Sequence, residues 1–392
     1  MLRLRLAPRQ THRCLAGHPW VFRSELAPED LAALPDGEAV AVHDRGGRLV
    51  GCGFASARSQ IAVRLCRRDE GPLDEQFLAA RLASALARRQ ALWPERAALR
   101  LVNSEGDLLP GLIVDRYGPC LVVQALTSAM ERRLPALVDW LRRALEPAQI
   151  LERSDGHGRQ AEGLEPRQRL WHGPQETRWR VRLGLVELDL DLADAHKTGA
   201  YLDQIPAQLA LMAWAPRGGR VADLFAHRGG FALHQLLAGA ASAVAVDSSA
   251  AGLADARAAA VRLGLDLATE RADVFAWLRA EHARGARYDL IILDPPSFAR
   301  SRAQRAGALR GYRDLHLQAL RLLPVGGRLA SWSCSSHIAL EELLASAVSA
   351  AAELGRWLRC EALFDQPPDH PWLAAAPETR YLKGFLASVA DG

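Results

Sequence analysis

Short runs of alternating hydrophobic and polar residues fill the first part of the chain. Three such runs lie at 38–44, 48–56 and 60–68, and Gly46 and Gly47 mark a turn between the first two. Short alternating strands that are joined by glycine turns are typical of a small β-barrel. A helical pattern over 73–93 follows and ends before Pro94, so we expect a domain boundary near residue 71.

The next part of the chain mixes the two periodicities. Two strand-like runs with a turn-rich loop between them span 99–126, an amphipathic helix follows at 131–145, and a further strand lies at 149–154. Residues 153–169 are rich in Arg and Gly and form the most loop-like segment of the chain. We therefore expect a central α+β domain at 71–177.

From residue 178 onward, buried strands alternate with helical patterns. The strand-like runs are 219–226, 242–249, 288–296 and 327–336, and the helical segments are 231–240, 250–265, 273–283 and 309–324. Repeated βα units predict a mostly parallel sheet with helices on both faces. The expected fold is a multi-domain chain: a β-barrel at 1–70, an α+β domain at 71–177 and an α/β, Rossmann-like domain at 178–392.

Composition and charge limit the class of protein. Of the 392 residues, 49% are hydrophobic and 24% are charged, which excludes a disordered, collagen-like or coiled-coil chain. The net charge of +4 permits a polyanionic partner only where cations gather on one face. The chain has no apolar run of about 18 residues, so we expect a cytoplasmic protein with no membrane partner. The six cysteines form neither a CxxC pair nor a Cys/His cluster, so no metal site is expected.

Candidate cofactor residues lie where the predicted parallel strands end, because ligands of such sheets bind at that edge. The first strand runs into a loop with Gly229 and Gly230 before a helix, which lets the backbone approach a ligand. The next strand ends at Asp247, at a spacing typical of an acid that contacts a ribose. Asp273 follows a third strand and could accept from an adenine amino group, or could cap a helix. Together these residues predict a cofactor that contains a nucleoside.

The fourth strand distinguishes two classes of cofactor. It ends in DPPSF (294–298), where two prolines stiffen the chain and hold Asp294 at the strand tip. A dehydrogenase does not need such a corner, whereas a methyltransferase that acts on a planar base can use the acid as an acceptor and the backbone as a wall. An ordinary strand-ending turn is the plainer alternative. The corner therefore favours S-adenosylmethionine over a dinucleotide.

Seven motifs, taken together and in order, carry a resemblance to a known family. They are HPWVF (18–22), NSEGDLLPGLIVDRYG (103–118), KTGAYLDQ (197–204), DLFAHRGGFA (223–232), DPPSF (294–298), SCSSH (333–337) and YLKGF (381–385). In this order the chain resembles the class I ribosomal RNA large subunit methyltransferase I family. The resemblance implies a PUA domain, a central α+β domain and a Rossmann-like methyltransferase domain. It also implies methyl transfer from S-adenosylmethionine to C5 of a cytosine in 23S ribosomal RNA.

The matching motifs imply a set of cofactor contacts. The expected residues are Lys197, Tyr201, Asp203, Gln204, Asp223, Phe225, His227, Gly229, Gly230, Asp247, Ser248, Asp273, Asp294 and Pro295. The chain departs from the family pattern in two places. Ile205 stands where the family usually has Arg, and His227 and Arg228 stand where Tyr and Thr are expected. These departures concern the cofactor contacts and leave the catalytic candidates unchanged.

Methylation of cytosine at C5 requires a nucleophile, because this carbon does not attack a sulfonium methyl group unaided. A thiolate that adds to C6 makes C5 electron-rich. Cys334 ends a predicted parallel strand beside the strand that bears Asp294, so Cys334 and Asp294 are the expected catalytic residues. A helix N-terminus, a nearby cation or the substrate would ionise the thiol, and His337 is a candidate neighbour. The alternative for Cys334 is a buried core cysteine.

Ribosomal RNA is the expected partner, and its target cytosine must be single-stranded or flipped out of a duplex. Local positive charge in RLCRR (64–68) and at Arg3, Arg5, Arg9 and Arg13 could contact phosphates. The basic stretch 300–314 follows DPPSF, and a loop there would border the acceptor pocket, so we favour RNA contact over a merely solvated helix face. Two other functions stay open, namely methylation of a base nitrogen and RNA binding without turnover. A homodimer also stays open.

Overall fold

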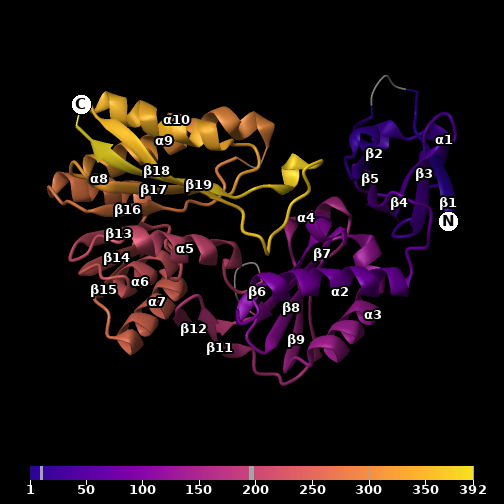
Figure 1. Ribbon diagram of the computed structural model, residues 1–392, viewed down its shortest axis with the longest axis horizontal. Helices are drawn as coiled ribbons and strands as arrows, with labels where there is room; N and C mark the ends of the chain where they lie inside the picture. Colours follow the sequence, from indigo (N-terminus) through magenta and orange to yellow (C-terminus); the bar gives the residue numbers. More distant parts are fainter. Residues whose placement is uncertain (9–11, 194–197, 300, 392) are drawn as a thin grey trace. The chain divides into compact units, whose positions relative to one another are not determined.

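The computed structural model describes residues 1–8, 12–193, 198–299 and 301–391, and these residues form two compact units (Figure 1). The first unit comprises Met1–Val181, Asp189–Leu202 and Pro368–Arg380. The second comprises Arg182–Leu188, Asp203–Pro367 and Tyr381–Gly392. Two later segments of the chain, 189–202 and 368–380, therefore belong to the unit that begins at the N-terminus.

The N-terminal part of the first unit contains a five-stranded sheet. Its strands are β1 (Leu2–Arg5), β2 (Trp20–Phe22), β3 (Ala39–His43), β4 (Leu49–Ala55) and β5 (Ile61–Arg67), in the order β1-β3-β4-β5-β2, with the short helix α1 (Pro28–Ala32). Leu4, Val40 and Val63 are fully buried in one core, as the alternating pattern predicts. Gly53 allows β5 to approach closely, because a Cβ there would lie 2.1 Å from the backbone oxygen of Arg64.

A second five-stranded sheet in the same unit has the order β10-β9-β8-β7-β6. Its strands are β6 (Ala98–Asn103), β7 (Leu112–Tyr117), β8 (Cys120–Ala125), β9 (Gln149–Ser154) and β10 (Arg167–His172). Helices α2 (Glu75–Leu92) and α3 (Ser128–Leu145) share one hydrophobic core with this sheet. The segment 153–169, expected to be a loop, contains α4 (His157–Ala161) and the start of β10. The expectation was wrong there because β10 lies at the sheet edge, with no fully buried residue to create a hydrophobic pattern.

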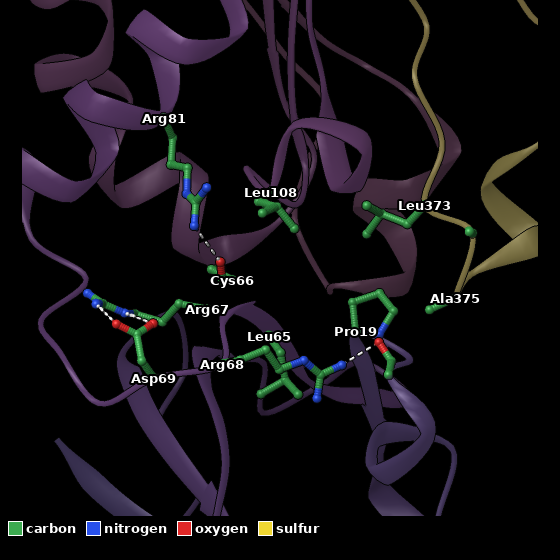
Figure 2. Close-up of a pocket in the computed structure, with 12 residues that line it drawn as sticks. Pro19, Leu65, Cys66, Arg67, Arg68, Asp69, Arg81, Leu108, Leu373 and Ala375 are labelled. Carbon is green, nitrogen blue, oxygen red and sulfur yellow. Dashed lines mark hydrogen bonds and ion pairs between the residues drawn. The ribbon is translucent and has the colours of Figure 1, made fainter.

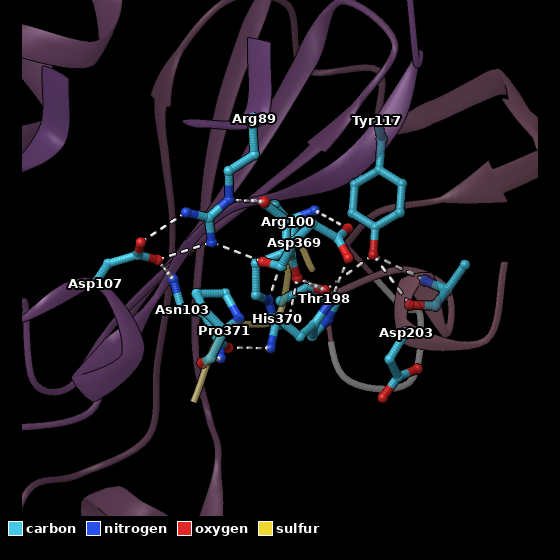
Figure 3. Close-up of polar contacts among 12 residues, drawn as sticks. Arg89, Arg100, Asn103, Asp107, Tyr117, Thr198, Asp203, Asp369, His370 and Pro371 are labelled. Atoms are coloured by element: carbon cyan, nitrogen blue, oxygen red, sulfur yellow. Dashed lines mark hydrogen bonds and ion pairs between the residues drawn. The ribbon is translucent and has the colours of Figure 1, made fainter. Parts of the chain in front are cut away.

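Buried polar contacts attach the two later segments to this unit (Figure 3). Arg89 donates to both carboxylate oxygens of Asp107, at 2.6 and 2.8 Å, and to the backbone oxygen of Asp369 at 2.6 Å. On the other segment, the hydroxyl of Thr198 donates to Asp115 at 2.5 Å and lies 2.9 Å from the hydroxyl of Tyr117. These contacts place residues far apart in sequence in one folded unit.

The second unit is built on a seven-stranded sheet in the order β15-β14-β13-β16-β17-β19-β18. The strands are β13 (Arg220–Leu224), β14 (Ser242–Asp247), β15 (Leu267–Arg271), β16 (Leu290–Leu293), β17 (Arg328–Ser333), β18 (Trp357–Asp365) and β19 (Lys383–Ala390). Within the described sheet, β19 runs antiparallel to the other six strands, which are parallel to one another. A separate hairpin of β11 (Arg178–Leu183) and β12 (Val186–Asp191) spans the division between the units.

Helices cover both faces of this sheet (Figure 1). They are α5 (Ile205–Leu211), α6 (Gly230–Leu237), α7 (Ala250–Leu263), α8 (Val274–Ala283), α9 (Arg305–Arg321) and α10 (Leu340–Glu353). Neighbouring residues of β16 enter different cores. Ile291 packs in the core that includes residues of α8, α9 and α10, and Ile292 packs in the core that includes residues of α5, α6 and α7. Burial on both faces explains why these strands are hydrophobic throughout instead of alternating.

Candidate active site

Three central strands bring the predicted acids to one edge of the sheet. β13 pairs in parallel with β14 on one side and with β16 on the other, so that Leu224 lies opposite both Val246 and Leu293. Asp247 and Asp294 are the residues that follow these two partners. The carboxyl ends of the three strands therefore meet where the sequence predicted a cofactor site.

The loop between β13 and α6 has an unusual backbone. Phe225, His227 and Gly229 all have positive φ values, of 62°, 47° and 66°. The Asp247 carboxylate stabilises this shape, because it accepts from the backbone N–H of His227 at 2.9 Å. It also accepts from the backbone N–H of Ser249, which follows β14, at 2.7 Å. Gly229 is required at its position, because an added Cβ would lie only 3.0 Å from the Cβ of Ala256 in addition to the strained φ. Asp247 thus shapes the glycine loop.

Asp223 is a buried acid at the end of β13. One carboxylate oxygen accepts from the backbone N–H of Ala232 at 2.9 Å, and the other has no hydrogen-bond partner among the described residues. Burial, together with the charges of Asp294 and Asp247, raises the pKa of Asp223 to about 8. An acceptor that is buried and unsatisfied suits a cationic donor such as the ammonium group of a methionyl moiety.

The turn Leu202–Gln204 supplies two further buried polar residues. Asp203 accepts from the hydroxyl of Tyr381 at 2.6 Å, and Oε1 of Gln204 has no hydrogen-bond donor within the described part of the chain. Gln208, one helical turn later, lies 2.4 Å from where a Cβ of Gly230 would stand, so this turn leads into a helix that packs beside the glycine loop. Tyr201 is exposed and belongs to the first unit, and Lys197 lies outside the described residues.

The remaining predicted cofactor residues have local roles in the structure. Asp273 is exposed and caps α8, since its carboxylate accepts from the backbone N–H of Ala276 at 2.9 Å. Ser248 is exposed, and its backbone oxygen accepts from Arg271 at 3.2 Å. Pro295 is buried directly after Asp294. The helix cap that the sequence left open for Asp273 is therefore present.

Cys334 and Asp294 follow neighbouring parallel strands. β16 and β17 pair so that Leu293 lies opposite Ser331, and both candidate residues are half-buried at the carboxyl edge. Both residues affect the ionisation of the Tyr312 hydroxyl. Burial is the main cause that raises the pKa of Tyr312, and the charges of Cys334 and Asp294 also raise it. The charged forms of Cys334 and Asp294 thus both disfavour ionisation of the Tyr312 hydroxyl.

Four of the other five cysteines are buried. Burial raises the pKa of Cys14 to about 11 and the pKa values of Cys66 and Cys120 to about 12, so these residues stay protonated thiols. Burial also raises the pKa of Cys52. Cys360 is exposed on β18, which is the edge strand of the sheet.

Lys383 lies in the motif YLKGF, for which the sequence suggested no specific role. It begins β19, where it lies opposite Ser333, and its buried ammonium donates to the backbone oxygens of Ser335 and, at 2.8 Å, of Tyr381. A cation therefore lies beside the loop that carries Cys334. One signal was available in the sequence: Lys197 and Lys383 are the two lysines in a chain whose other cations are arginines.

The basic stretch 300–314 does not form the expected loop. Apart from Arg300, which lies outside the described residues, it forms a short turn at Arg302–Gln304 and the first part of α9. Arg305 pairs with Glu342, and Arg313 donates to Glu353 at 2.6 Å, both on α10. The loop expectation was wrong because these arginines satisfy acids on the adjacent helix.

No group of His, Cys, Asp or Glu in the described chain is arranged to hold a metal ion. No described helix is both long enough and apolar enough to span a bilayer.

Comparison with known proteins identifies two domain families. The PUA-like domain family matches residues 4–68, and the S-adenosylmethionine-dependent methyltransferase family matches residues 166–383. A methyltransferase structure from Streptococcus mutans, described as SAM-dependent, has 19% sequence identity, covers 99% of this chain and 100% of its own, and superposes with a TM-score of 0.83. A similar methyltransferase structure complexed with SAH gives a TM-score of 0.84 at 19% identity, with 99% of this chain and 100% of that chain covered.

The chain is thus an S-adenosylmethionine-dependent methyltransferase with an N-terminal PUA-like domain, and the predicted fold class is confirmed. Two curated relatives are more specific. Ribosomal RNA large subunit methyltransferase I of Shewanella denitrificans is 36% identical over 395 residues, and that of Escherichia coli (strain K12 / MC4100 / BW2952) is 36% identical over 400 residues; each alignment covers 99% of both chains. The chain belongs to the ribosomal RNA large subunit methyltransferase I family.

Proposed function

We propose that this protein methylates C5 of a cytosine in 23S ribosomal RNA through a covalent bond between Cys334 and C6 of the base. The observation that carries the proposal is the position of Cys334 and Asp294 at the ends of two paired parallel strands, β17 and β16. The names of the relatives, which are 36% identical along the whole chain, support ribosomal RNA as the substrate.

The residues around the glycine loop suit the cofactor. Asp223 and Gln204 present buried acceptor atoms without donors among the described residues, which fits a methionyl ammonium. Asp247 has acceptor capacity left beside its two backbone bonds, because each carboxylate oxygen has two lone pairs, so it suits the ribose hydroxyls. Phe225, His227, Gly229, Gly230, Ser248 and Pro295 would line the remainder of the site, with Asp273 at the adenine.

S-adenosylmethionine, when bound, supplies an electrophilic methyl group. The Cys334 thiolate adds its electron pair to C6, and the C5–C6 π electrons become available at C5 for the methyl group. Asp294 hydrogen-bonds the N3/N4 edge and shares a proton with it as Cys334 adds, which limits the charge on the ring. Loss of the C5 proton, to water or to Asp294, then restores the double bond and breaks the sulfur–C6 bond, which releases Cys334.

The Cys334 thiol needs help to ionise, since a free thiol has a pKa of about 8.5. The Lys383 ammonium donates to the backbone oxygen of Ser335, the residue after Cys334, so a cation lies beside the thiol's loop. We assign Lys383 to the stabilisation of the thiolate. Its two carbonyl contacts make it a positioning residue rather than a catalytic one.

Product analysis tests the proposed function. Ribosomal RNA from a strain that lacks the enzyme is incubated with the protein and tritium-labelled methyl donor, and the nucleosides are then separated. The proposal expects the label in 5-methylcytidine and no transfer by Cys334→Ala, whereas Cys360→Ala, which removes the exposed cysteine, transfers like the wild type. Label in a methylated guanosine or adenosine, with full activity of Cys334→Ala, would instead establish methylation of a base nitrogen.

A further inference from the structure

The first unit contains a cleft whose lining residues are distant in sequence from the acids of the methyltransferase site. It consists of two adjoining cavities of about 300 and about 290 Å³, which share Arg67, Asp69 and Arg81. Figure 2 shows the residues that line the first of them. The apolar lining comprises Pro19, Leu65, Leu108, Leu373, Ala374 and Ala375. Each cavity is comparable to the smaller ligand pockets of proteins, which begin at roughly 300 Å³.

The charged groups of this cleft are mostly cations. Arg67, Arg68 and Arg81 line it together with one acid, Asp69. Asp69 compensates Arg67, whose Nε donates to it at 3.0 Å. Arg68 donates to backbone oxygens, among them that of Cys14 at 2.9 Å, and forms no ion pair with a carboxylate in the described chain. The cleft therefore keeps an excess of positive charge.

Arg81 is the most informative of these residues. It is half-buried, and its guanidinium lies over the ring of Phe77 at 5.1 Å, where Arg67 also lies, at 5.6 Å. Its side chain makes one hydrogen bond, to the backbone oxygen of Cys66 at 3.3 Å, and pairs with no carboxylate among the described residues. Because a guanidinium has five N–H donors, Arg81 has donors left for an anionic ligand.

We infer that this cleft binds one nucleotide of a single-stranded RNA segment. Its phosphate lies against Arg81, since a guanidinium recognises phosphate oxygens with paired N–H donors. Arg68, whose terminal nitrogens donate to backbone oxygens, adds positive charge beside it. Its base packs on the apolar side formed by Leu65, Leu108 and Leu373, as unstacked RNA bases do in many protein sites. The inference rests on the proposed function, from which it takes RNA as the partner, and it adds a second RNA contact outside the methyltransferase domain.

Variants of the full-length protein test this site with a fluorescent 23S ribosomal RNA transcript as the probe. Arg81→Gln is expected to raise the dissociation constant on the order of tenfold and to lower the salt slope of binding by about one, as loss of a phosphate contact does. Phe77→Leu is expected to weaken binding several-fold with little change in the salt slope. Arg143→Gln is the matched control, because it removes an exposed arginine of α3 in the same unit, paired with Asp139.

A second measurement locates the RNA. A transcript that contains 4-thiouridine is irradiated with the protein, and the linked peptides are mapped by mass spectrometry. Links to residues 65–69, 77–84 and 373–375 are expected. Wild-type affinity and salt slope for Arg81→Gln, or links that avoid these three peptides, would overturn the inference.

These binding measurements do not depend on which atom is methylated. If the product is not 5-methylcytidine but Arg81→Gln still weakens RNA binding, the cleft assignment stands and the proposed function falls. If 5-methylcytidine forms while Arg81→Gln binds the transcript like the wild type, only the cleft assignment falls.

Discussion

The carboxylate of Asp247 accepts a hydrogen bond from the backbone N–H of His227 at 2.9 Å. His227 has a φ of 47°, a conformation that most side chains avoid, so the acid at the tip of β14 stabilises a strained loop after β13. Through this contact Asp247 prepares the loop as well as offering acceptors to a ribose.

Replacement of Asp247 by Ala removes both the ribose acceptors and the support of the loop. We expect the dissociation constant for S-adenosylmethionine to rise by about tenfold or more, because hydrogen bonds to charged groups contribute roughly 1.5–3 kcal/mol. Isothermal titration calorimetry measures this constant. Asp289→Ala is the matched control, since Asp289 also accepts from a backbone N–H, that of Arg220 at 2.8 Å, but precedes β16 at the opposite sheet edge. Equal losses in both variants would contradict a specific role for Asp247.

The raised pKa of Asp223, about 8, makes cofactor binding depend on pH. Below pH 8 the carboxyl group is protonated and cannot neutralise the cofactor's ammonium, so affinity is expected to fall as the pH drops from 8 to 6, by at most about tenfold per pH unit. Titrations of the wild type and Asp223→Asn across this range test the relationship. The variant is expected to bind more weakly with a flatter pH profile, and an unchanged profile would disprove the link.

The same group affects the stability of the ligand-free protein. Its pKa in the folded state lies above the unfolded value of 3.8, so Asp223 binds its proton more tightly when the chain is folded. Its stabilising contribution is therefore complete below about pH 4 and is lost as the pH rises through 8. Melting temperatures of the wild type and Asp223→Asn are expected to diverge in favour of the variant toward pH 8. Parallel curves would show that Asp223 ionises normally.

Lys383 is expected to control the reactivity of Cys334. In Lys383→Met the cation beside the Cys334 loop is lost, so alkylation of Cys334 by iodoacetamide at pH 7 should slow several-fold, as thiolate reactivity follows nearby charge. Mass spectrometry of the peptide that contains Cys334 gives the rate, and alkylation of the exposed Cys360 in the same sample is an internal control. Lys383→Arg, which keeps the charge, should retain more of the rate. Identical rates in all three proteins would remove Lys383 from the account.

The buried pair of Arg89 and Asp107 is expected to stabilise the first unit. Asp107→Ala leaves the Arg89 guanidinium buried without its carboxylate, and breaking a buried pair in this way typically costs about 3–5 kcal/mol. Chemical denaturation of the full chain is the measurement. Asp139→Ala on α3, which breaks exposed pairs with Arg142 and Arg143, should change stability by less than about 1 kcal/mol. Comparable effects of the two variants would contradict the importance of burial.

The elements that could be predicted from the sequence are those marked by a local pattern of hydrophobic residues. The α/β alternation after residue 178 follows from buried strands such as β16, with neighbours Ile291 and Ile292 in opposite cores, and the structure confirms the strands and helices expected there. The acids Asp247 and Asp294 were predicted at one edge for the same reason, because parallel strands carry their ends together.

Contacts between distant segments could not be predicted in this way. Nothing in residues 368–380 indicates that they join the first unit, since the link is made by single groups such as the backbone oxygen of Asp369 on Arg89. The start of α9 was expected to be a loop. Its arginines pair with acids on another helix, as Arg305 does with Glu342, and such pairs are not visible in the local sequence. The position of Lys383 beside the Cys334 loop likewise depends on the antiparallel pairing of β19 with β17, which the sequence does not indicate.

The most direct test of the central claim is covalent trapping on RNA that contains 5-fluorocytosine. Fluorine at C5 cannot leave as a proton does, so an enzyme that attacks C6 through sulfur stays bound to the methylated base. With S-adenosylmethionine present, we predict a denaturation-resistant protein–RNA adduct in the wild type and in Cys360→Ala, joined through the peptide that contains Cys334, and none in Cys334→Ala. Methyl transfer to the RNA without any adduct in the wild type would contradict the account.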